Sequence, residues 1–183
     1  MDNKYRIKIN DVYNKNSTNI YRWKNTLDFL SIPLYKFKKG LDIGEKSPLT
    51  DMLEELYSIK FENTNVDLDL EILTGNYDII TSFEVIEHLY NPLFNLLEIR
   101  KILNDDGVLY LSTPLYKPGF LWSPNHFHEM KRESIINLFK KANFEIIREH
   151  TFKIHPNTFY LKGFRPFLRL FFERVQIFEL KKI

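Results

Sequence analysis

Cysteine is absent from this chain of 183 residues. Its absence excludes disulfide bonds, thiolate metal ligands and a cysteine nucleophile, and it is compatible with a reducing compartment. The sequence also lacks any apolar run near the roughly 18 residues that a membrane-spanning helix needs. The opening residues MDNKYRIKINDVY carry scattered charges and show no apolar stretch followed by a cleavage site. We therefore expect a cytoplasmic protein.

An excess of charge of one sign is also missing. The chain has 26 Lys and Arg residues against 24 Asp and Glu residues, which gives a net charge of +2. This balance offers no general argument for a nucleic-acid partner, so none is expected. The chain is 44% hydrophobic and 27% charged, as is typical of globular proteins. Without a repeat, a low-complexity tract or a linker, residues 1–183 are expected to form a single domain.

The first half of the chain predicts a helix and then a strand, a turn and a second helix. STNIYRWKNTLDFL has apolar residues at helical spacing over about 17–30, with Ser17 or Thr18 as the N-cap. GLDIG reads as a short buried strand that enters a tight turn. Ser47 and Pro48 then supply the cap and the first residue of the next helix.

The second half alternates strands and helices. YDIITSF and GVLYLST predict strands, and between them Pro92 opens the amphipathic helix LFNLLEIRKIL. A strand, a helix and a strand in this order form a right-handed parallel crossover. RESIINLFKKA predicts a further helix and NFEIIREHTF a further strand, whereas YSIKFEN is a weak strand and NVDLDLE a strand or a loop. The pattern indicates an open α/β sheet with helices on both faces.

Ligands of such sheets bind outside the carboxyl ends of the strands. This rule selects the residues at and just after the ends of the predicted strands. They are Asp42, Gly44, Glu62, Asp67, Asp69, Phe83, Glu84, Ser112, Thr113 and Pro114.

Several motifs occur in the order of a known family. The run from GLDIG through YDIITSFEVIEHLYNP and LNDDGVLYLSTP to HFHE and KKANFEII resembles class I S-adenosylmethionine-dependent methyltransferases, in the group that includes ubiquinone-biosynthesis O-methyltransferases. The resemblance covers residues 38 to 150. It implies a Rossmann-like, mostly parallel sheet, shortened here around the second and third strands, with S-adenosylmethionine as cofactor across the strand ends.

The family's glycine motif is only partly present. Asp42 and Gly44 match its acidic residue and its first glycine, which lets the backbone approach the cofactor. Lys46 and Pro48 stand where the second and third glycines would be. This departure leaves open whether the methionine end of the cofactor is held in the usual way.

Further cofactor-binding residues follow from the resemblance. Glu62 is the nearest match to the carboxylate that accepts hydrogen bonds from the ribose hydroxyls. Asp67 or Asp69 resembles the acid that receives the adenine amino group, and the pattern does not separate them from each other or from a solvated acidic loop. Phe83 and Glu84 stand where the family packs the nucleoside and methionine portions.

The segment EVIEH contains two carboxylates and an imidazole, which are candidate catalytic groups. On a helical turn, Glu84, Glu87 and His88 would share one face at i, i+3 and i+4. His88 fits a general base oriented by Glu87 or by His128, and we predict His88 and His128 as catalytic residues without a metal. Alternatively, the three residues join His126 or His128 around a metal ion, as in methyltransferases that modify the terminal ribose of small RNAs. A structural His88 is the third interpretation.

The segment FRPFLRLFFERVQIFEL combines aromatic and basic residues, and it predicts a helical segment over about 164–180. Basic residues beside exposed aromatic residues are suited to a membrane surface or a lipid-linked acceptor. Packing against the sheet or against a second subunit, as in a homodimer, is the alternative.

These observations lead to one functional expectation and two alternatives. We expect methyl transfer from S-adenosylmethionine to an oxygen of a small molecule or a saccharide, such as a surface-polysaccharide or lipid-linked precursor. A metal-dependent RNA terminal-ribose methyltransferase is the alternative enzyme. The third reading is a binding module without catalysis, in which Lys46 and Pro48 close the methionine pocket.

Overall fold

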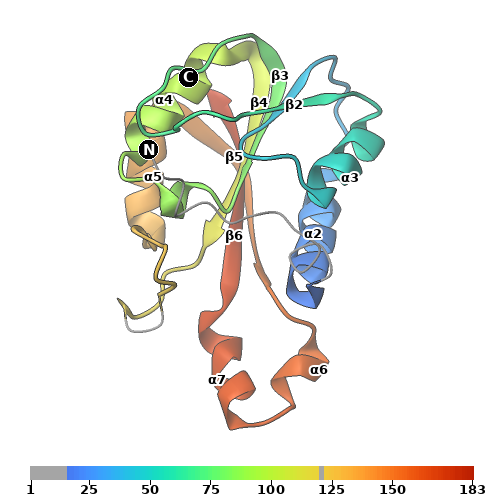
Figure 1. Ribbon diagram of the computed structural model, residues 1–183, viewed down its shortest axis with the longest axis vertical. Helices are drawn as coiled ribbons and strands as arrows, with labels where there is room; N and C mark the ends of the chain where they lie inside the picture. Colours follow the sequence, from blue (N-terminus) through green and yellow to red (C-terminus); the bar gives the residue numbers. More distant parts are fainter. Residues whose placement is uncertain (1–15, 120–121) are drawn as a thin grey trace.

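The computed structural model describes residues 16–119 and 122–183, and the opening residues used to infer location lie outside this range. A six-stranded sheet forms the centre of the molecule, with strand order β2-β1-β3-β4-β6-β5 (Figure 1). The strands β2, β1, β3 and β4 are parallel, and β6 is antiparallel to both β4 and β5. Their bounds are β1 Gly40–Asp42, β2 Phe61–Asn63, β3 Tyr77–Phe83, β4 Leu103–Pro114, β5 Phe144–Lys153 and β6 Arg174–Lys182.

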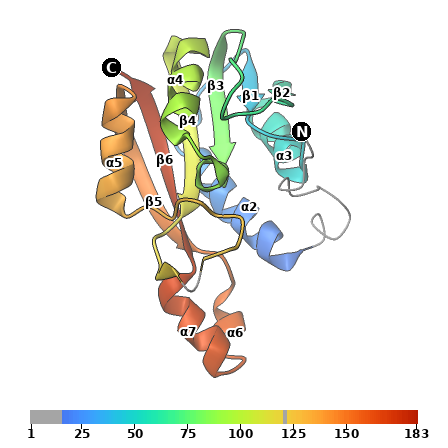
Figure 2. The same ribbon diagram turned by 60° about the vertical axis from the view of Figure 1, so that its left-hand side comes forward.

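Helices cover both faces of the sheet, which confirms the predicted α/β class. Helices α2 and α3 lie on one face and α4 and α5 on the other (Figures 1 and 2). A short helical hairpin, α6 and α7, extends beyond the sheet between β5 and β6. None of the helices in the described residues has the length and apolarity to cross a membrane. The helix bounds are α2 Ser17–Leu30, α3 Pro48–Tyr57, α4 Pro92–Ile102, α5 Arg132–Lys141, α6 Asn157–Tyr160 and α7 Phe164–Phe172.

The core has two layers because successive side chains of a strand point to opposite faces. On β3, Ile79 belongs to the layer under α2 and α3, and Ile80 belongs to the layer under α4 and α5. Both side chains are fully buried. A strand buried on both faces reads as a continuous hydrophobic run, which is why YDIITSF was recognisable from its sequence.

The region after β2 is short, as predicted. Strand β2 has only three residues, and the described residues 64–76 form turns and bends before β3 begins. NVDLDLE is therefore a loop and not a strand. The Asp67 carbonyl accepts hydrogen bonds from the backbone of Leu70 and Glu71, which closes a compact turn.

The predicted helix over 164–180 is wrong in its second half. Helix α7 ends at Phe172, and residues from Arg174 onward form β6, which pairs with β4 on one side and with β5 on the other. β6 has six successive buried residues from Val175 to Leu180. The apolar residues of this stretch, Val175, Ile177, Phe178 and Leu180, do not by their spacing distinguish a strand from a helix, so pairing with two neighbours decides the outcome.

The helix starts were predicted with mixed success. α3 begins at Pro48 after Ser47, as expected, and the Ser47 N–H donates to Thr50 Oγ1 at 3.0 Å. The cap of α2 is Asn16, whose Oδ1 accepts from the Thr18 N–H at 2.9 Å, so the assignment of the cap to Ser17 or Thr18 was wrong. Asn is as good a cap as Ser, and the cap lies one position before Ser17.

Candidate active site

Asp42 ends β1 and holds the following turn in place. Its two carboxylate oxygens accept from the hydroxyls of Thr50 and Thr81, each at 2.6 Å. Burial raises the pKa of Asp42 to about 6, against the lowering effect of these hydrogen bonds. Thr50 also receives the Ser47 N–H, so one hydroxyl joins the strand end to the start of α3. Both oxygens of the Asp42 carboxylate are thus bonded within the protein, so Asp42 supports the turn at the ligand edge.

Gly44 presents open backbone at this edge. Its φ is +114°, a conformation that side chains rarely allow, and a Cβ placed on it meets no atom of the described residues within 4 Å. Its N–H donates to Thr64 Oγ1 at 2.7 Å. The Lys46 ammonium pairs with two carboxylates of α3, Asp51 at 2.8 Å and Glu54 at 3.5 Å, and does not cover Gly44. The turn therefore fits close approach of a cofactor, despite the missing second and third glycines.

Glu62 is engaged elsewhere. Its carboxylate accepts from the Tyr77 hydroxyl at 2.6 Å and pairs with Lys39 at 2.9 Å, and both partners lie at the amino ends of their strands. The hydrogen bond from Tyr77 and then the one from Lys39 lower the pKa of Glu62. The residues at the end of β2 are Asn63 and Thr64, which the sequence analysis did not select. The ribose role of Glu62 stays a prediction, and in this structure its carboxylate is turned away from the edge.

Asp67 and Asp69 are separated by the structure. Asp67 is exposed, and its carboxylate accepts from the Asp69 N–H at 3.0 Å. The Asp69 carboxylate accepts from the N–H groups of Tyr90 and Asn91 at 3.2 and 2.7 Å. Asp69 therefore ties the 64–76 loop to the segment between β3 and α4. Both adenine roles stay predictions.

Glu84 follows Phe83 at the end of β3 and has a left-handed backbone with φ 56°. Its carboxylate accepts from Ser112 Oγ at 2.8 Å and pairs with Arg22 of α2 at 3.1 Å. Phe83 is half-buried and packs against the core beneath α2. A non-glycine residue in this conformation is costly and occurs often at functional sites. Phe83 and Glu84 thus lie at the edge where they were expected.

The predicted face of Glu84, Glu87 and His88 does not form. The helical turn is a 3₁₀ helix, η1, over Ile86–His88, and Glu84 precedes it in its left-handed conformation. Glu87 is buried, with Oε2 3.3 Å from the Thr113 hydroxyl and no hydrogen-bond partner for Oε1 among the described residues. Burial, and then the charge of Glu84, raises the pKa of Glu87 well above its ordinary value.

His88 has a defined tautomer. Its Nδ1 lies 2.8 Å from the Asn125 carbonyl oxygen, which only accepts, so Nδ1 carries the proton. Nε2 keeps its lone pair and lies 4.0 Å from Glu87 Oε1. Burial lowers the pKa of His88 below its ordinary value, which favours the neutral ring. The orienting group is therefore a backbone carbonyl, and not Glu87 or His128 as predicted.

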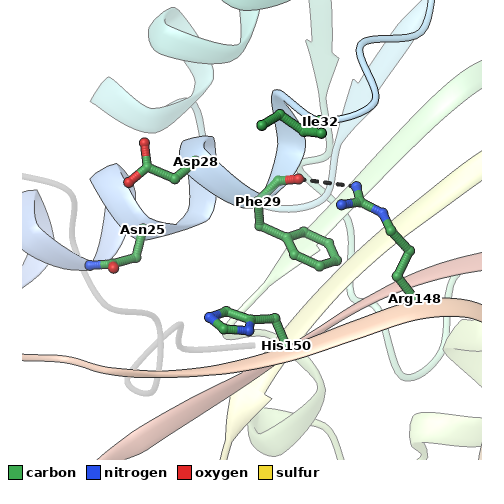
Figure 3. Close-up of a pocket in the computed structure, with 6 residues that line it drawn as sticks. All are labelled: Asn25, Asp28, Phe29, Ile32, Arg148 and His150. Carbon is green, nitrogen blue, oxygen red and sulfur yellow. Dashed lines mark hydrogen bonds between the residues drawn. The ribbon is translucent and has the colours of Figure 1, made fainter.

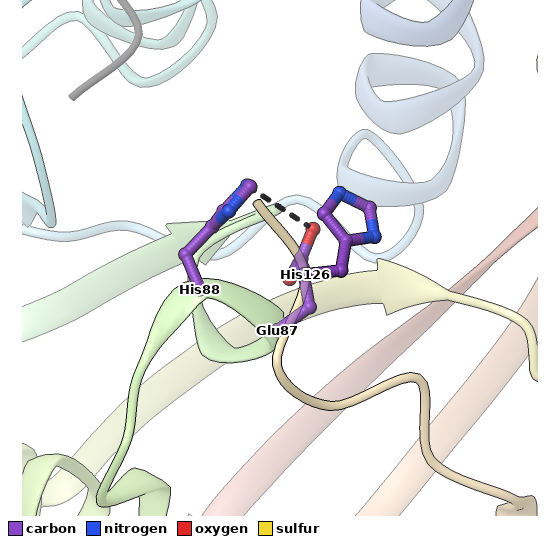
Figure 4. A group of neighbouring side chains, drawn as sticks. All are labelled: Glu87, His88 and His126. Atoms are coloured by element: carbon purple, nitrogen blue, oxygen red, sulfur yellow. Dashed lines mark ion pairs between the residues drawn. The ribbon is translucent and has the colours of Figure 1, made fainter. Parts of the chain in front are cut away.

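His126 is the imidazole that contacts His88. The two rings meet edge to face with centroids 4.8 Å apart, and they flank the Glu87 carboxylate (Figure 4). His126 Nδ1 lies 2.7 Å from Glu129 Oε1, which also pairs with Lys117 at 3.2 Å. Ligand atoms of Glu87, His88 and His126 lie within 4.8 Å of one another.

His128 lies outside this cluster. Its backbone N–H donates to the Glu87 carbonyl at 3.2 Å, next to a bond from Phe127 at 2.8 Å. These two bonds fasten the HFHE loop to η1. For the contact between His126 and Glu129, the i, i+3 spacing of the two residues was the only signal in the sequence. The catalytic role of His128 stays a prediction.

A separate pocket of about 390 Å³ lies between α2 and β5 (Figure 3). The Arg148 guanidinium crosses it, donates to the Phe29 carbonyl at 3.0 Å and pairs with Glu179 at 2.5 Å. These bonds join α2 to the sheet. The lining comes from α2, the residues after it and β5, and includes none of the strand-end residues above; it consists of Asn25, Asp28, Phe29, Ile32, Arg148 and His150.

The chain is similar in sequence to known methyltransferases. A family model described as a methyltransferase domain matches residues 16–149. The ubiquinone biosynthesis O-methyltransferase of Nitrosococcus oceani is 31% identical over 78 residues, which are 40% of this chain and 33% of that protein. The chain covers about a third of the length of each of the two curated relatives that it matches, 32% and 33%.

Solved structures share the fold. The Burkholderia thailandensis 1,6-didemethyltoxoflavin-N1-methyltransferase, with S-adenosylhomocysteine bound, aligns with a TM-score of 0.61 over 94% of this chain and 81% of its own, at 12% identity. An O-methyltransferase of a Brevibacillus brevis multienzyme, in complex with S-adenosylhomocysteine, gives 0.57 over 87% and 71%, at 15% identity. With the family model matching more than half of its residues, the chain belongs to the methyltransferase domain family, and its fold is that of the class I S-adenosylmethionine-dependent methyltransferases.

Proposed function

We propose that this protein transfers a methyl group from S-adenosylmethionine to an oxygen of a small molecule or a saccharide. The observation that carries the proposal is His88, a neutral imidazole at the ligand edge of the sheet whose Nε2 lies 4.0 Å from Glu87 Oε1 and has no hydrogen bond among the described residues. A hydroxyl acceptor must lose its proton as its oxygen attacks, whereas a neutral amine attacks without prior deprotonation. An oriented neutral base therefore favours oxygen as the methylated atom.

The residues present at the edge fit the cofactor. Gly44 offers open backbone and Glu84 a fixed carboxylate at neighbouring strand ends, so these residues would hold S-adenosylmethionine. The cofactor supplies an electrophilic methyl group when bound. The open space before Gly44 supports an enzyme over a binding module with a closed pocket, because Lys46 is held on α3.

The protein's own part in the reaction is to position groups and accept a proton. The Asn125 carbonyl fixes the His88 ring, so that Nε2 would take the proton of the acceptor hydroxyl. Arg22 and Ser112 keep the Glu84 carboxylate in one orientation. Part of the barrier would be removed by positioning alone.

Calorimetric titration with S-adenosylhomocysteine tests the proposal, using Gly44→Ala and the matched control Gly163→Ala. Both glycines have positive φ and open space around a Cβ, so the substitutions strain the backbone alike. Gly44→Ala should weaken binding about tenfold, as expected for a lost backbone contact, while Gly163→Ala should not. Absence of binding to the parent protein at millimolar concentration would refute the proposal.

One observation favours a second candidate, a metal-dependent methyltransferase acting on a terminal ribose of RNA. Glu87, His88 and His126 form a cluster of potential ligands, and Asn125 and Glu129 orient the two rings as outer partners of metal-binding histidines do. Metal analysis of protein purified without chelators separates the candidates. A stoichiometric divalent ion that His126→Ala removes would favour the metal enzyme, and metal-free active protein would exclude it.

A further inference from the structure

The segment from Thr151 to Arg174 is strongly basic. It contains five Lys or Arg residues and a single acidic residue, Glu173, for a net charge of +4. Because the whole chain carries +2, the remaining residues carry a net charge of −2. The positive charge of the protein is therefore concentrated in the segment that contains α6 and α7.

The same segment exposes large apolar side chains. Phe164, Phe167 and Phe171 lie at i, i+3 and i+7 on α7 and so share one face of the helix. They are 75%, 45% and 56% exposed, and Leu161 before the helix is 83% exposed. The rings of Phe167 and Phe171 meet edge to face at 5.6 Å, which makes the apolar face continuous.

The hairpin has a packed side as well. Tyr160 and His155 are buried, and His155 stacks on Phe159 with the ring centroids 3.8 Å apart. Glu173 pairs with His155 and Arg169, each at 3.4 Å, so the only acid of the segment is paired with bases inside it. The hairpin thus buries some aromatic residues and leaves those of α7 outside.

The hairpin extends from the ligand edge of the sheet (Figures 1 and 2). It begins after the pair Lys153–Arg174, one step beyond Phe152–Val175, and Val175 also pairs with Pro114 at the carboxyl end of β4. His155 Nδ1 lies 3.3 Å from the Thr18 hydroxyl at the start of α2. The basic, aromatic surface is therefore on the same side of the molecule as the strand ends.

We propose that the α6–α7 hairpin docks on the surface of an anionic lipid bilayer. An amphipathic helix with aromatic residues on one face and basic residues beside them binds such a surface by burying the rings and by attraction to the headgroups. A second copy of the chain would bring two segments of charge +4 together, and this repulsion disfavours a dimer through the same face. An anionic bilayer complements both the exposed aromatic rings and the positive charge of the hairpin.

The docking does not depend on methyl transfer. Docking through the hairpin would direct the ligand edge toward the membrane. Together with the proposed function, on which this conclusion about the acceptor rests, the docking identifies the acceptor class as a hydroxyl compound held at the bilayer by a lipid chain. S-adenosylhomocysteine binding measured on the same samples keeps failure of docking distinct from failure of the proposed function.

Co-sedimentation of the full chain with lipid vesicles tests the proposal. The protein should sediment with phosphatidylglycerol-rich vesicles and stay in solution with pure phosphatidylcholine vesicles. Raising NaCl from about 0.1 M to about 1 M should weaken binding, since the screening length falls from about 10 Å to about 3 Å. Phosphate ions alone should not compete, because the rings must enter the interface.

The variant joins the substitutions Phe164→Ser, Phe167→Ser and Phe171→Ser. It should lose vesicle affinity by about tenfold or more while keeping its unfolding temperature and its affinity for S-adenosylhomocysteine. The control joins three comparably exposed apolar residues outside the hairpin and should bind vesicles like the parent: Ile20→Ser, Leu34→Ser and Ile147→Ser.

Three outcomes would overturn the proposal. The first is a parent protein that stays in solution with anionic vesicles, and the second is equal binding of the hairpin variant and the control. Sedimentation equilibrium that shows a parent dimer, with the hairpin variant monomeric, would assign the surface to a second copy instead.

Discussion

Glu84 combines a strained backbone with a fully bonded carboxylate. A φ of 56° is uncommon for a non-glycine residue, and the bonds to Arg22 and Ser112 hold the side chain in this conformation. The residue follows directly after β3, so the strain occurs at the edge of the sheet where we propose that the cofactor binds. Strain of this kind keeps a group oriented before the ligand arrives.

Asp42 predicts an unusual dependence of stability on pH. Its pKa is about 6 in the folded protein, against an ordinary value of 3.8, so the folded state binds more protons between these values. The free energy of unfolding therefore decreases as the pH rises from about 4 to about 6, by about 3 kcal/mol. Asp42→Asn removes this titration. In urea unfolding across that range the parent should lose about 3 kcal/mol more than Asp42→Asn, because the other carboxyl groups titrate in both proteins, and parallel curves would contradict the assignment.

His88 predicts a separation of binding from turnover. His88→Ala should keep S-adenosylhomocysteine affinity and lose roughly a hundredfold to ten-thousandfold in rate with a hydroxyl acceptor. Because burial lowers the pKa of His88, the parent's rate should fall only at a pH below 6.5, the ordinary imidazole value. Initial rates of S-adenosylhomocysteine formation check both points, with substitution of the exposed His150 of β5, His150→Ala, as control. Normal turnover by His88→Ala would make His88 structural.

The sequence predicted single residues where a strand end defines them. Gly44 and Glu84 follow recognisable strands and Phe83 ends one, and all three lie at the expected edge. His126 was considered only as one of two metal-ligand choices, because its position against His88 depends on how the HFHE loop folds back onto η1. The spacing of residues along the sequence does not show that a loop folds back onto an earlier element in this way.

At the scale of elements, one hydroxyl connects β1 to α3. Thr50 donates to Asp42 and receives the Ser47 N–H. Thr50→Val keeps the shape but removes the hydrogen bonds to buried Asp42 Oδ2 and to the half-buried Ser47 N–H, which should lower the free energy of unfolding by about 1–3 kcal/mol. Thr151→Val, at an exposed position of β5, should change it by less than about 0.5 kcal/mol. Equal effects of the two substitutions in urea unfolding would show that the link does not stabilise the turn.

Helices and strands with a clear period were predictable, and those defined by their neighbours were not. The apolar spacing of α4 and α5 and the caps Asn91 and Ser47 mark helices within their own sequences. β6 becomes a strand because β4 and β5 both offer it backbone partners. The loop at 64–76 stays irregular, with its turns held by Asp67 and Asp69.

At the scale of the whole molecule, the sheet places its candidate site residues and its basic hairpin on one side. Four parallel strands direct Gly44, Glu84 and the η1 cluster to a common edge, and β5 and β6 carry α6 and α7 past that edge. The near-neutral net charge concealed this arrangement, since a basic segment and an acidic remainder nearly cancel. Composition alone therefore gave no indication of a charged surface.

A crystal structure of the protein with S-adenosylhomocysteine tests the central claim most directly. The account predicts that the ligand lies against Gly44 and Glu84, with its sulfur within about 8 Å of His88 Nε2. An acceptor oxygen then fits between them, since it must lie about 3 Å from the methyl carbon and about 3 Å from the base. A ligand bound elsewhere, or a sulfur facing away from His88, would contradict the account.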